Sequence, residues 1–180
     1  MKRYQFGSLV VALGLYLAPV LRAQNQPTEG IRFGVGGGLI LPMGNYADVD
    51  KAGWNLLGVI QLPISRSPIH LRFDAMYGQT SHKSTFGSGN TTLTGATGDL
   101  LYHLGEHAAK VRPYVLGGLG VYNVDAGGSS ETDFTFGFGG GILFGIGTMH
   151  AFLEGRYMSV QASGASLPFV PVTFGVMFGR

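Results

Sequence analysis

Apolar and polar residues alternate along most of the chain with a period of two. Segment 69–77 shows the pattern most clearly. One of its faces carries the apolar set Ile69, Leu71, Phe73, Ala75 and Tyr77, and the other carries His70, Arg72, Asp74 and Met76. Successive side chains of a β-strand point to opposite faces, so this alternation predicts a strand with one apolar and one polar face.

Eight such segments follow one another, at residues 31–41, 54–62, 69–77, 91–104, 112–124, 133–147, 149–160 and 169–178. Their length is roughly ten residues, as in tilted strands that cross a membrane. Leu93 and Leu101 blur the alternation in 91–104, and segment 112–124 is apolar on both faces. The pattern predicts an all-β fold, an eight-stranded antiparallel up-and-down transmembrane β-barrel.

The connections between these segments alternate in length. Residues 42–53, 81–90, 125–132 and 161–167 are polar and rich in Gly, Ser, Asn and Asp, whereas 64–68 and 147–148 are short. The connection 105–111 is the exception. Long loops at one end and short turns at the other are typical of an outer-membrane barrel whose long loops lie outside the cell.

The polar faces hold mostly Gly, Thr, Ala and Asn, and only 12% of all residues are charged. Small side chains suit a narrow barrel interior better than a solvated surface, so we expect the apolar faces to contact lipid. Aromatic residues are expected to form two belts at the bilayer interfaces. The predicted outer belt is Trp54, Tyr77, Tyr122, Phe134 and Tyr157, and the inner belt is Phe33, Tyr102, Tyr114, Phe144 and Phe178.

The glycine-rich segment 133–147, DFTFGFGGGILFGIG, has three readings: a phosphate-binding loop, a linker or a strand. Its residues Phe134, Phe136 and Phe138 share one face, and glycines occupy the other. The spacings of phosphate-binding glycine motifs do not occur in the chain. We therefore interpret the segment as a lipid-facing strand whose glycines point into the barrel.

The first 23 residues have the pattern of a secretory signal peptide. Lys2 and Arg3 precede an apolar run at 6–19, and Ala23 is the expected last residue before cleavage. The barrel domain would then span residues 24–180, with nine Lys and Arg against ten Asp and Glu, a net charge of about −1. This balance excludes a basic nucleic-acid-binding surface. The absence of Cys excludes disulfides and thiolate metal sites.

Four segments, FGVGGGLILPMGNY, RPYVLGGLGVYNV, FLEGRY and FVPVTFGVMF, resemble the repeated phrases of small outer-membrane barrels. The chain is similar to the OmpA-, OmpX- and OmpW-type proteins, and above all to the group described as outer membrane protein β-barrel domain. The resemblance implies a location in the bacterial outer membrane, contact with its lipid and a monomeric state. It also implies that the assembly machinery reads the last strand. Val176 and Phe178 fit that signal, whereas Thr173 stands where Gly is common.

Charged and imidazole side chains lie on the predicted inner faces: Arg32, His70, Arg72, Asp74, Asp99, His103, Glu154 and Arg156. Buried charges must be paired or hydrated, so these residues are expected to form a polar network in the lumen. One interpretation is a structural plug. The other is a gated pore that opens when partners exchange. The plug is favoured, because the interior of an eight-stranded barrel is normally filled.

Catalysis by a barrel of this kind would need a nucleophile held beside a base. Ser81 and His82 are adjacent in a predicted outer loop, but adjacency in sequence does not place them for attack. The five His are scattered without the spacing of metal ligands. We expect no enzyme activity, no cofactor and no metal site.

Three functions remain open at this stage. The first is a structural or surface-interaction barrel whose loops meet the environment. The second is a transporter or channel for small apolar solutes, which the charged inner faces argue against. The third, a periplasmic lipocalin-like binding protein, would require the apolar faces to point inward.

Overall fold

The computed structural model describes residues 30–64, 67–86, 88–104, 109–162 and 165–179. The predicted signal peptide, residues 1–23, lies outside this part of the chain. The described residues form eight long strands, a short helix α2 (Gly44–Val49) and a 3-10 turn η2 (Ser84–Phe86). The strands are β1 (Arg32–Pro42), β2 (Gly53–Pro63), β3 (Ile69–Ser81), β4 (Asn90–His103), β5 (Val111–Ala126), β6 (Ser129–Ile146), β7 (Met149–Ala162) and β8 (Ala165–Phe178).

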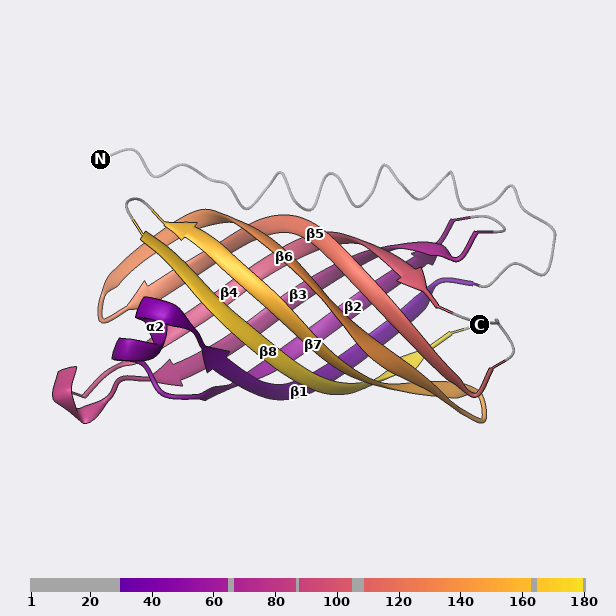
Figure 1. Ribbon diagram of the computed structural model, residues 1–180, viewed down its shortest axis with the longest axis horizontal. Helices are drawn as coiled ribbons and strands as arrows, with labels where there is room; N and C mark the ends of the chain where they lie inside the picture. The colour runs from indigo at the N-terminus through magenta and orange to yellow at the C-terminus, as the bar shows by residue number, and fades with distance from the viewer. Residues whose placement is uncertain (1–29, 65–66, 87, 105–108, 163–164, 180) are drawn as a thin grey trace.

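The strands close into one antiparallel barrel in sequence order (Figure 1). Each strand pairs with its neighbours in the chain, and β1 pairs with β8 from Phe33 opposite Phe178 to Pro42 opposite Phe169. The predicted up-and-down barrel is therefore confirmed. Closure leaves no open sheet edge along the barrel wall, which a spanning β-structure requires in lipid. Among the described helices, none is both long and apolar enough to cross a membrane.

One end of the barrel holds the start of β1, the end of β8 and the β6–β7 turn, and α2 lies at the opposite end (Figure 1). The β6–β7 turn is tight, with Gly147 at a positive φ of 61°. In barrels of this type the short turns face the periplasm and the longer loops face outward. The two longest connections between strands, β1–β2 (43–52) and β3–β4 (82–89), lie at the end that carries α2, which is therefore called the outer rim. It also holds the β5–β6 and β7–β8 connections.

Two of the four predicted long loops are largely strand, so that part of the prediction is wrong. β5 continues to Ala126 and β6 begins at Ser129, which leaves a two-residue turn at Gly127 and Gly128 with φ of 64° and 100°. β7 and β8 likewise extend to Ala162 and from Ala165. The prediction was wrong because it took polar composition as a sign of a loop. A two-stranded ribbon that projects into water pairs its backbone while its polar side chains stay hydrated.

The apolar faces point outward and the polar faces point inward. On β3 the outward Phe73 and Tyr77 are 42% and 43% exposed, whereas Arg72 and Asp74 are buried. On β6 the outward Phe134 and Phe138 are exposed, and Thr135 is buried between them. The prediction that the glycine-rich segment is a strand with outward aromatic residues and inward glycines is thus confirmed. A lipocalin-like arrangement would need the reverse orientation.

The inward glycines make room for aromatic rings from the neighbouring strand. Tyr122 stands opposite Gly95, Tyr114 opposite Gly141 and Phe152 opposite Gly175. A Cβ added at Gly95 would lie within 2.7 Å of three ring carbons of Tyr122. The glycine-rich composition therefore lets bulky rings lie flat inside a narrow barrel.

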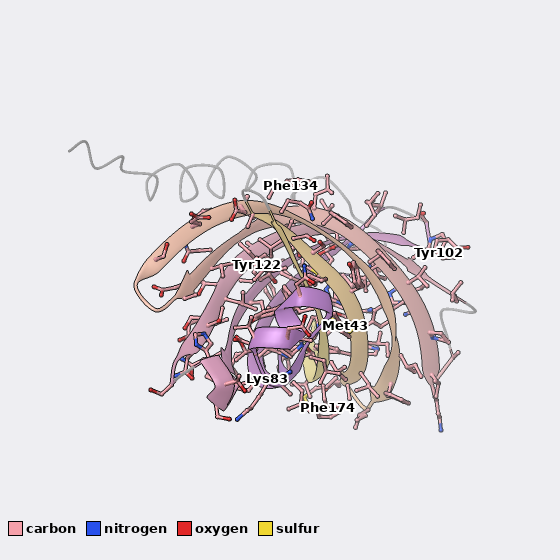
Figure 2. The ribbon with its side chains drawn as sticks, turned by 60° about the vertical axis from the view of Figure 1, so that its left-hand side comes forward. Met43, Lys83, Tyr102, Tyr122, Phe134 and Phe174 are labelled. Carbon is pink, nitrogen blue, oxygen red and sulfur yellow. The ribbon has the colours of Figure 1, made fainter. Side chains whose placement is uncertain are left out.

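Two members of the predicted aromatic belts are wrong. Tyr114 and Tyr122 are each only 3% exposed and lie in the lumen, because each ring covers the glycine opposite it. Figure 2 shows Tyr102, Phe134 and Phe174 on the outside of the barrel, whereas Tyr122 lies within it. The remaining belt residues are on outward faces: Trp54, Tyr77, Phe134 and Tyr157 toward the outer rim, and Phe33, Tyr102, Phe144 and Phe178 toward the other end.

Replacing Gly95 with Ala should destabilise the barrel by about 1–3 kcal/mol, because the added methyl group overpacks the lumen against Tyr122. Gly155→Ala is the matched control, since its Cβ would meet no atom within 4 Å. Urea unfolding in detergent micelles, followed by the gel shift between folded and heated protein, measures both. Equal midpoints for the two variants would contradict the packing of Tyr122 on Gly95.

Candidate functional site

Ion pairs cross the lumen between β3 and β7, which lie on opposite sides of the eight-stranded barrel. Arg72 on β3 donates to both carboxylate oxygens of Glu154 on β7, at 2.6 and 3.1 Å. Its Nε donates to Asp74 Oδ1 at 2.8 Å. Arg156 on β7 donates back across the lumen to Asp74 Oδ2. Such forked, charge-assisted hydrogen bonds fix both the distance and the orientation of the partners.

Strands β4 and β5 extend this network around the wall. The second guanidinium nitrogen of Arg156 donates to Asp99, whose other oxygen accepts a hydrogen bond from Thr97 at 2.7 Å. The Tyr114 hydroxyl donates to Glu154 Oε2 at 2.7 Å. We call the group Arg72, Asp74, Thr97, Asp99, Tyr114, Glu154 and Arg156 the lumen network. Its three carboxylates each receive hydrogen bonds from neighbouring side chains, which offsets the cost of burying their charge.

The structure places all eight predicted lumen residues in the interior, but only five of them in the lumen network. Arg32, His70 and His103 are buried nearer the end opposite the outer rim. The sequence reasoning missed Arg112 and Asp50, which are also buried. The alternation around Arg112 was too weak to assign a face, and Asp50 lies in a loop. With these two added, the described residues bury four Arg and four carboxylates, so the interior charge balances.

A second polar cluster joins His70, His103 and Gln61 below the lumen network. Gln61 Nε2 lies 2.9 Å from Nδ1 of His70 and 3.3 Å from Nε2 of His103. The two imidazole rings meet edge to face, with centroids 4.7 Å apart, and the His103 ring also contacts the Tyr114 ring. An amide NH₂ group only donates, so the ring nitrogens that face it act as acceptors. Polar side chains therefore fill this end of the lumen as well.

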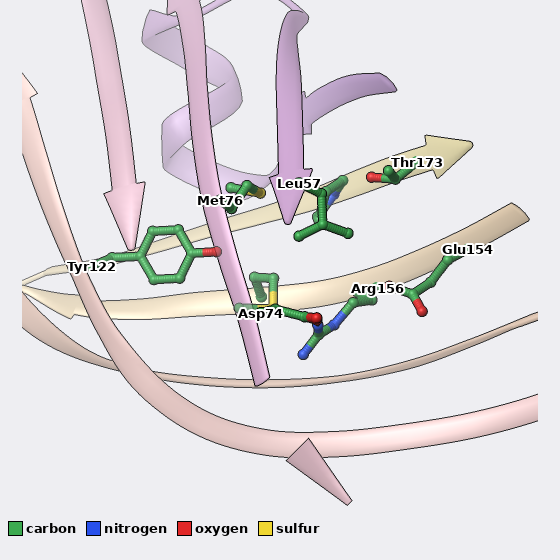
Figure 3. Close-up of a pocket in the computed structure, with 9 residues that line it drawn as sticks. Leu57, Asp74, Met76, Tyr122, Glu154, Arg156 and Thr173 are labelled. Carbon is green, nitrogen blue, oxygen red and sulfur yellow. The ribbon is translucent and has the colours of Figure 1, made fainter. Parts of the chain in front are cut away.

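Little space remains beside the lumen network. Figure 3 shows Asp74 and Arg156 close together and the Tyr122 hydroxyl directed into the interior. The cavity that these residues line together with Leu57, Met76, Glu154 and Thr173 measures about 10 Å³. That volume is at the lower limit for one water molecule. The arrangement can hold charges in place, but this cavity offers no room for a solute.

A larger cavity of about 370 Å³ opens at the outer rim between α2, the β3–β4 connection and the tips of β5 and β8. Its lining is mainly apolar, with Val49, Val124 and Leu167. The Tyr46 hydroxyl from α2 lies 2.6 Å from Thr80 Oγ1, and Thr80 donates to Asp50 at 2.5 Å. This relay anchors α2 to the end of β3, so the cavity is held by the fold.

Ser81 and His82 do not form a nucleophile and base. The Ser81 hydroxyl donates to Asn90 at 3.0 Å on the exposed side of β3, whereas His82 faces the rim cavity. His82 Nε2 lies 3.3 Å from Thr91 Oγ1 and 3.6 Å from Asp50 Oδ1. A catalytic triad uses the two ring nitrogens for different partners, but here one nitrogen faces both. Within the described ranges, no group of three or more His, Asp or Glu is placed to hold a metal ion.

The sequence model of a family described as outer membrane protein beta-barrel domain matches residues 8–179. The chain belongs to that family. The barrel accordingly lies in the bacterial outer membrane. No curated protein sequence matches the chain.

Solved structures similar to this outer-membrane barrel share its fold at low sequence identity. Neisserial surface protein A is 15% identical, with a TM-score of 0.66, and the match covers 86% of this chain and 100% of that one. A major outer membrane protein from Thermus thermophilus is 10% identical at a TM-score of 0.52, covering 83% and 99%. The outer membrane enzyme PagL is 13% identical at 0.51, covering 84% and 100%. These likenesses show the fold alone.

Removing Arg156 should destabilise the barrel by about 3–5 kcal/mol, because Asp74 and Asp99 would stay buried with one cationic partner removed. Arg156→Met tests this by urea unfolding in micelles, and Lys51→Met at the exposed rim is the control. A triple variant that also carries Asp74→Asn and Asp99→Asn should regain part of the loss. An Arg156→Met midpoint equal to that of Lys51→Met would contradict the role given to the network.

Burial raises the pKa of Tyr46 to about 12 from its ordinary value of 10.0. The neutral phenol is the form that the folded rim favours, so its contribution to stability is present below pH 10 and disappears as the pH rises to about 12. Between these values α2 should loosen. We expect proteolysis of the β1–β2 loop to rise steeply there in the wild type. Tyr46→Phe, which cannot ionise, should show a smaller rise, and an equal rise would contradict this anchor.

Proposed function

We propose that this protein is a closed outer-membrane barrel whose function is structural or interactive and resides at its outer rim. The observation that carries the proposal is the pair of ionic links between β3 and β7, Arg72 with Glu154 and Arg156 with Asp74. They join opposite walls, so a solute on the barrel axis would have to separate buried charges. Breaking a buried pair costs several kcal/mol, which opposes spontaneous opening.

The same observation weighs against transport of small apolar solutes through the lumen. Such a route would need a continuous apolar wall, whereas the middle of this lumen carries Arg72, Asp74, Asp99, Glu154 and Arg156. The rim cavity is apolar, but it lies at the outer end of the barrel above this layer. A cavity of this size supports binding at the surface better than passage across the membrane.

Catalysis is not part of the proposal. The described residues that resemble catalytic groups at the rim, Ser81, His82 and Asp50, lack the geometry of a nucleophile with its base. Likeness to PagL at 13% identity concerns the fold, and a fold does not carry an activity with it.

The partners in this proposal are membrane lipid on the outward apolar faces and the assembly machinery at β8. On β8 the outward residues Val172, Phe174, Val176 and Phe178 alternate with buried Thr173 and Met177. That alternation supports recognition of the last strand during insertion. Because β1 and β8 close the barrel within one chain, the fold needs no second copy, which supports a monomer.

Liposomes that contain the purified barrel should show no swelling in arabinose, glycine or glycerol above that of empty liposomes. We expect no added swelling because ion pairs occupy the lumen and leave no path for these solutes. The double variant Arg72→Ala and Arg156→Ala removes both arginines, and swelling by that variant alone would identify the network as the barrier. Swelling by the wild type would overturn the closed barrel and favour a channel.

Cysteine labelling on intact cells tests which end is the outer rim, because the chain contains no Cys. Gly128→Cys in the β5–β6 turn should react with a membrane-impermeant maleimide on intact cells. Gly147→Cys in the β6–β7 turn should react only after the outer membrane is permeabilised. Both positions are exposed turn glycines, so they differ mainly in the side of the membrane. The opposite labelling pattern would show that the barrel is inverted.

A further inference from the structure

One strand carries an open edge beyond the closed wall. β6 pairs with β5 along its whole length, up to Ser129 opposite Ala126. Its pairing with β7 begins only at Thr135, opposite Val160. The six residues 129–134, which we call the β6 edge, therefore have a partner strand on one side only among the described residues. At about 3.3 Å per residue the edge is roughly 20 Å long.

Within the residues that the structure describes, the neighbouring strand is too short to cover the whole of this edge. β7 has only two residues beyond Val160, Gln161 and Ala162, and both pair with β8. The strands β7 and β8 therefore end at this rim, while β5 and β6 continue farther outward as a two-stranded ribbon (Figure 1). An unpaired edge presents backbone N–H and C=O groups that another extended chain can pair with.

The β6 edge is exposed and acidic. Ser129, Ser130, Glu131 and Thr132 are exposed polar residues and Asp133 is half-buried, which favours water over lipid around residues 129–133. Glu131 and Asp133 are two residues apart in a strand and thus share one face. The described residues provide no hydrogen-bond donor for the buried Oδ2 of Asp133. This face can therefore accept hydrogen bonds from cationic side chains.

We propose that the β6 edge binds an extended, basic segment of another protein by strand addition. The incoming strand would pair its backbone with residues 129–134 and place Lys or Arg at alternate positions, opposite Glu131 and Asp133. Opposite charges on directly facing residues stabilise neighbouring strands. This inference rests on the proposed function, because it names the part of the outer rim that makes the interaction.

A second copy of the chain fits the edge poorly. Two β6 edges brought together would place Glu131 and Asp133 of one copy beside the same two carboxylates of the other. Like charges on facing strands are destabilising. An acidic partner segment is excluded for the same reason, and a basic one remains.

The test uses the full-length barrel in nanodiscs of phosphatidylcholine, whose headgroup has no net charge. The probe is a fluorescent nine-residue peptide that alternates Lys and Val, and its binding is followed by fluorescence anisotropy. Three control peptides have the same length. One replaces Lys with Glu, and the other two keep Lys but carry N-methyl groups on alternate backbone nitrogens, one peptide for each edge of the strand. The Lys–Val peptide should bind more tightly than the Glu peptide and more tightly than at least one of the two N-methylated peptides, the one whose pairing edge is blocked.

Charge variants in the same hairpin locate the site. Glu131→Gln with Asp133→Asn should weaken binding about fivefold, which corresponds to the loss of two facing charge pairs. Asp125→Asn is the matched control, because Asp125 lies at the same tip but on β5, away from the edge. Binding should also slow hydrogen exchange of the backbone amides that residues 129–134 direct toward the edge.

Three results would overturn the inference. They are the absence of binding at millimolar peptide, binding of both N-methylated peptides as tight as that of the Lys–Val peptide, and equal weakening by Asp125→Asn. None of these results bears on the swelling or the cysteine-labelling experiment. The proposed function would therefore stand, with another part of the outer rim as the site of interaction. Swelling of wild-type liposomes would instead overturn the proposed function while peptide binding persisted.

Discussion

The structure depends on the need to satisfy every charge inside a narrow, closed barrel. Arg72 meets Glu154 and Asp74, and Arg156 meets Asp74 and Asp99. Because these links run between β3 and β7, they hold opposite walls at a fixed separation. A charge left alone in this interior would cost several kcal/mol, so the network and the closed wall stabilise each other. The same links occupy the lumen, which supports the proposal that interactions with the surroundings take place at the outer rim.

Aromatic rings, packed on glycines of the neighbouring strands, fill much of the rest of the lumen. Eight strands enclose little room, yet the lumen holds the rings of Tyr114, Tyr122 and Phe152. Each ring lies over a glycine of the adjacent strand, which has no side chain to compete with the ring for space. On the outside, the same strands carry large exposed apolar side chains. The same strands thus combine inward glycines with outward apolar side chains.

The strands differ in length, and this difference creates the features of the outer rim. β6 has 18 residues and β7 has 14, so the β5–β6 ribbon projects past its neighbour. The β1–β2 connection, by contrast, folds back as α2 and is tied to β3 through Tyr46, Thr80 and Asp50. Among the described residues, an anchored cavity and a strand edge with a partner on one side only thus lie at the same end of the barrel.

The sequence by itself determined the fold and the inward position of eight charged or imidazole residues, because side chains of a strand alternate strictly between its two faces. It did not determine which of them meet. Arg72 and Glu154 are 82 positions apart, and only barrel closure places their strands opposite each other. Alternation also could not assign Tyr114 and Tyr122 to a face, because segment 112–124 is apolar on both faces. Their rings point inward because the cross-strand register places Gly141 and Gly95 opposite them. Strand length, and with it the β6 edge, was also decided by pairing in the tertiary structure.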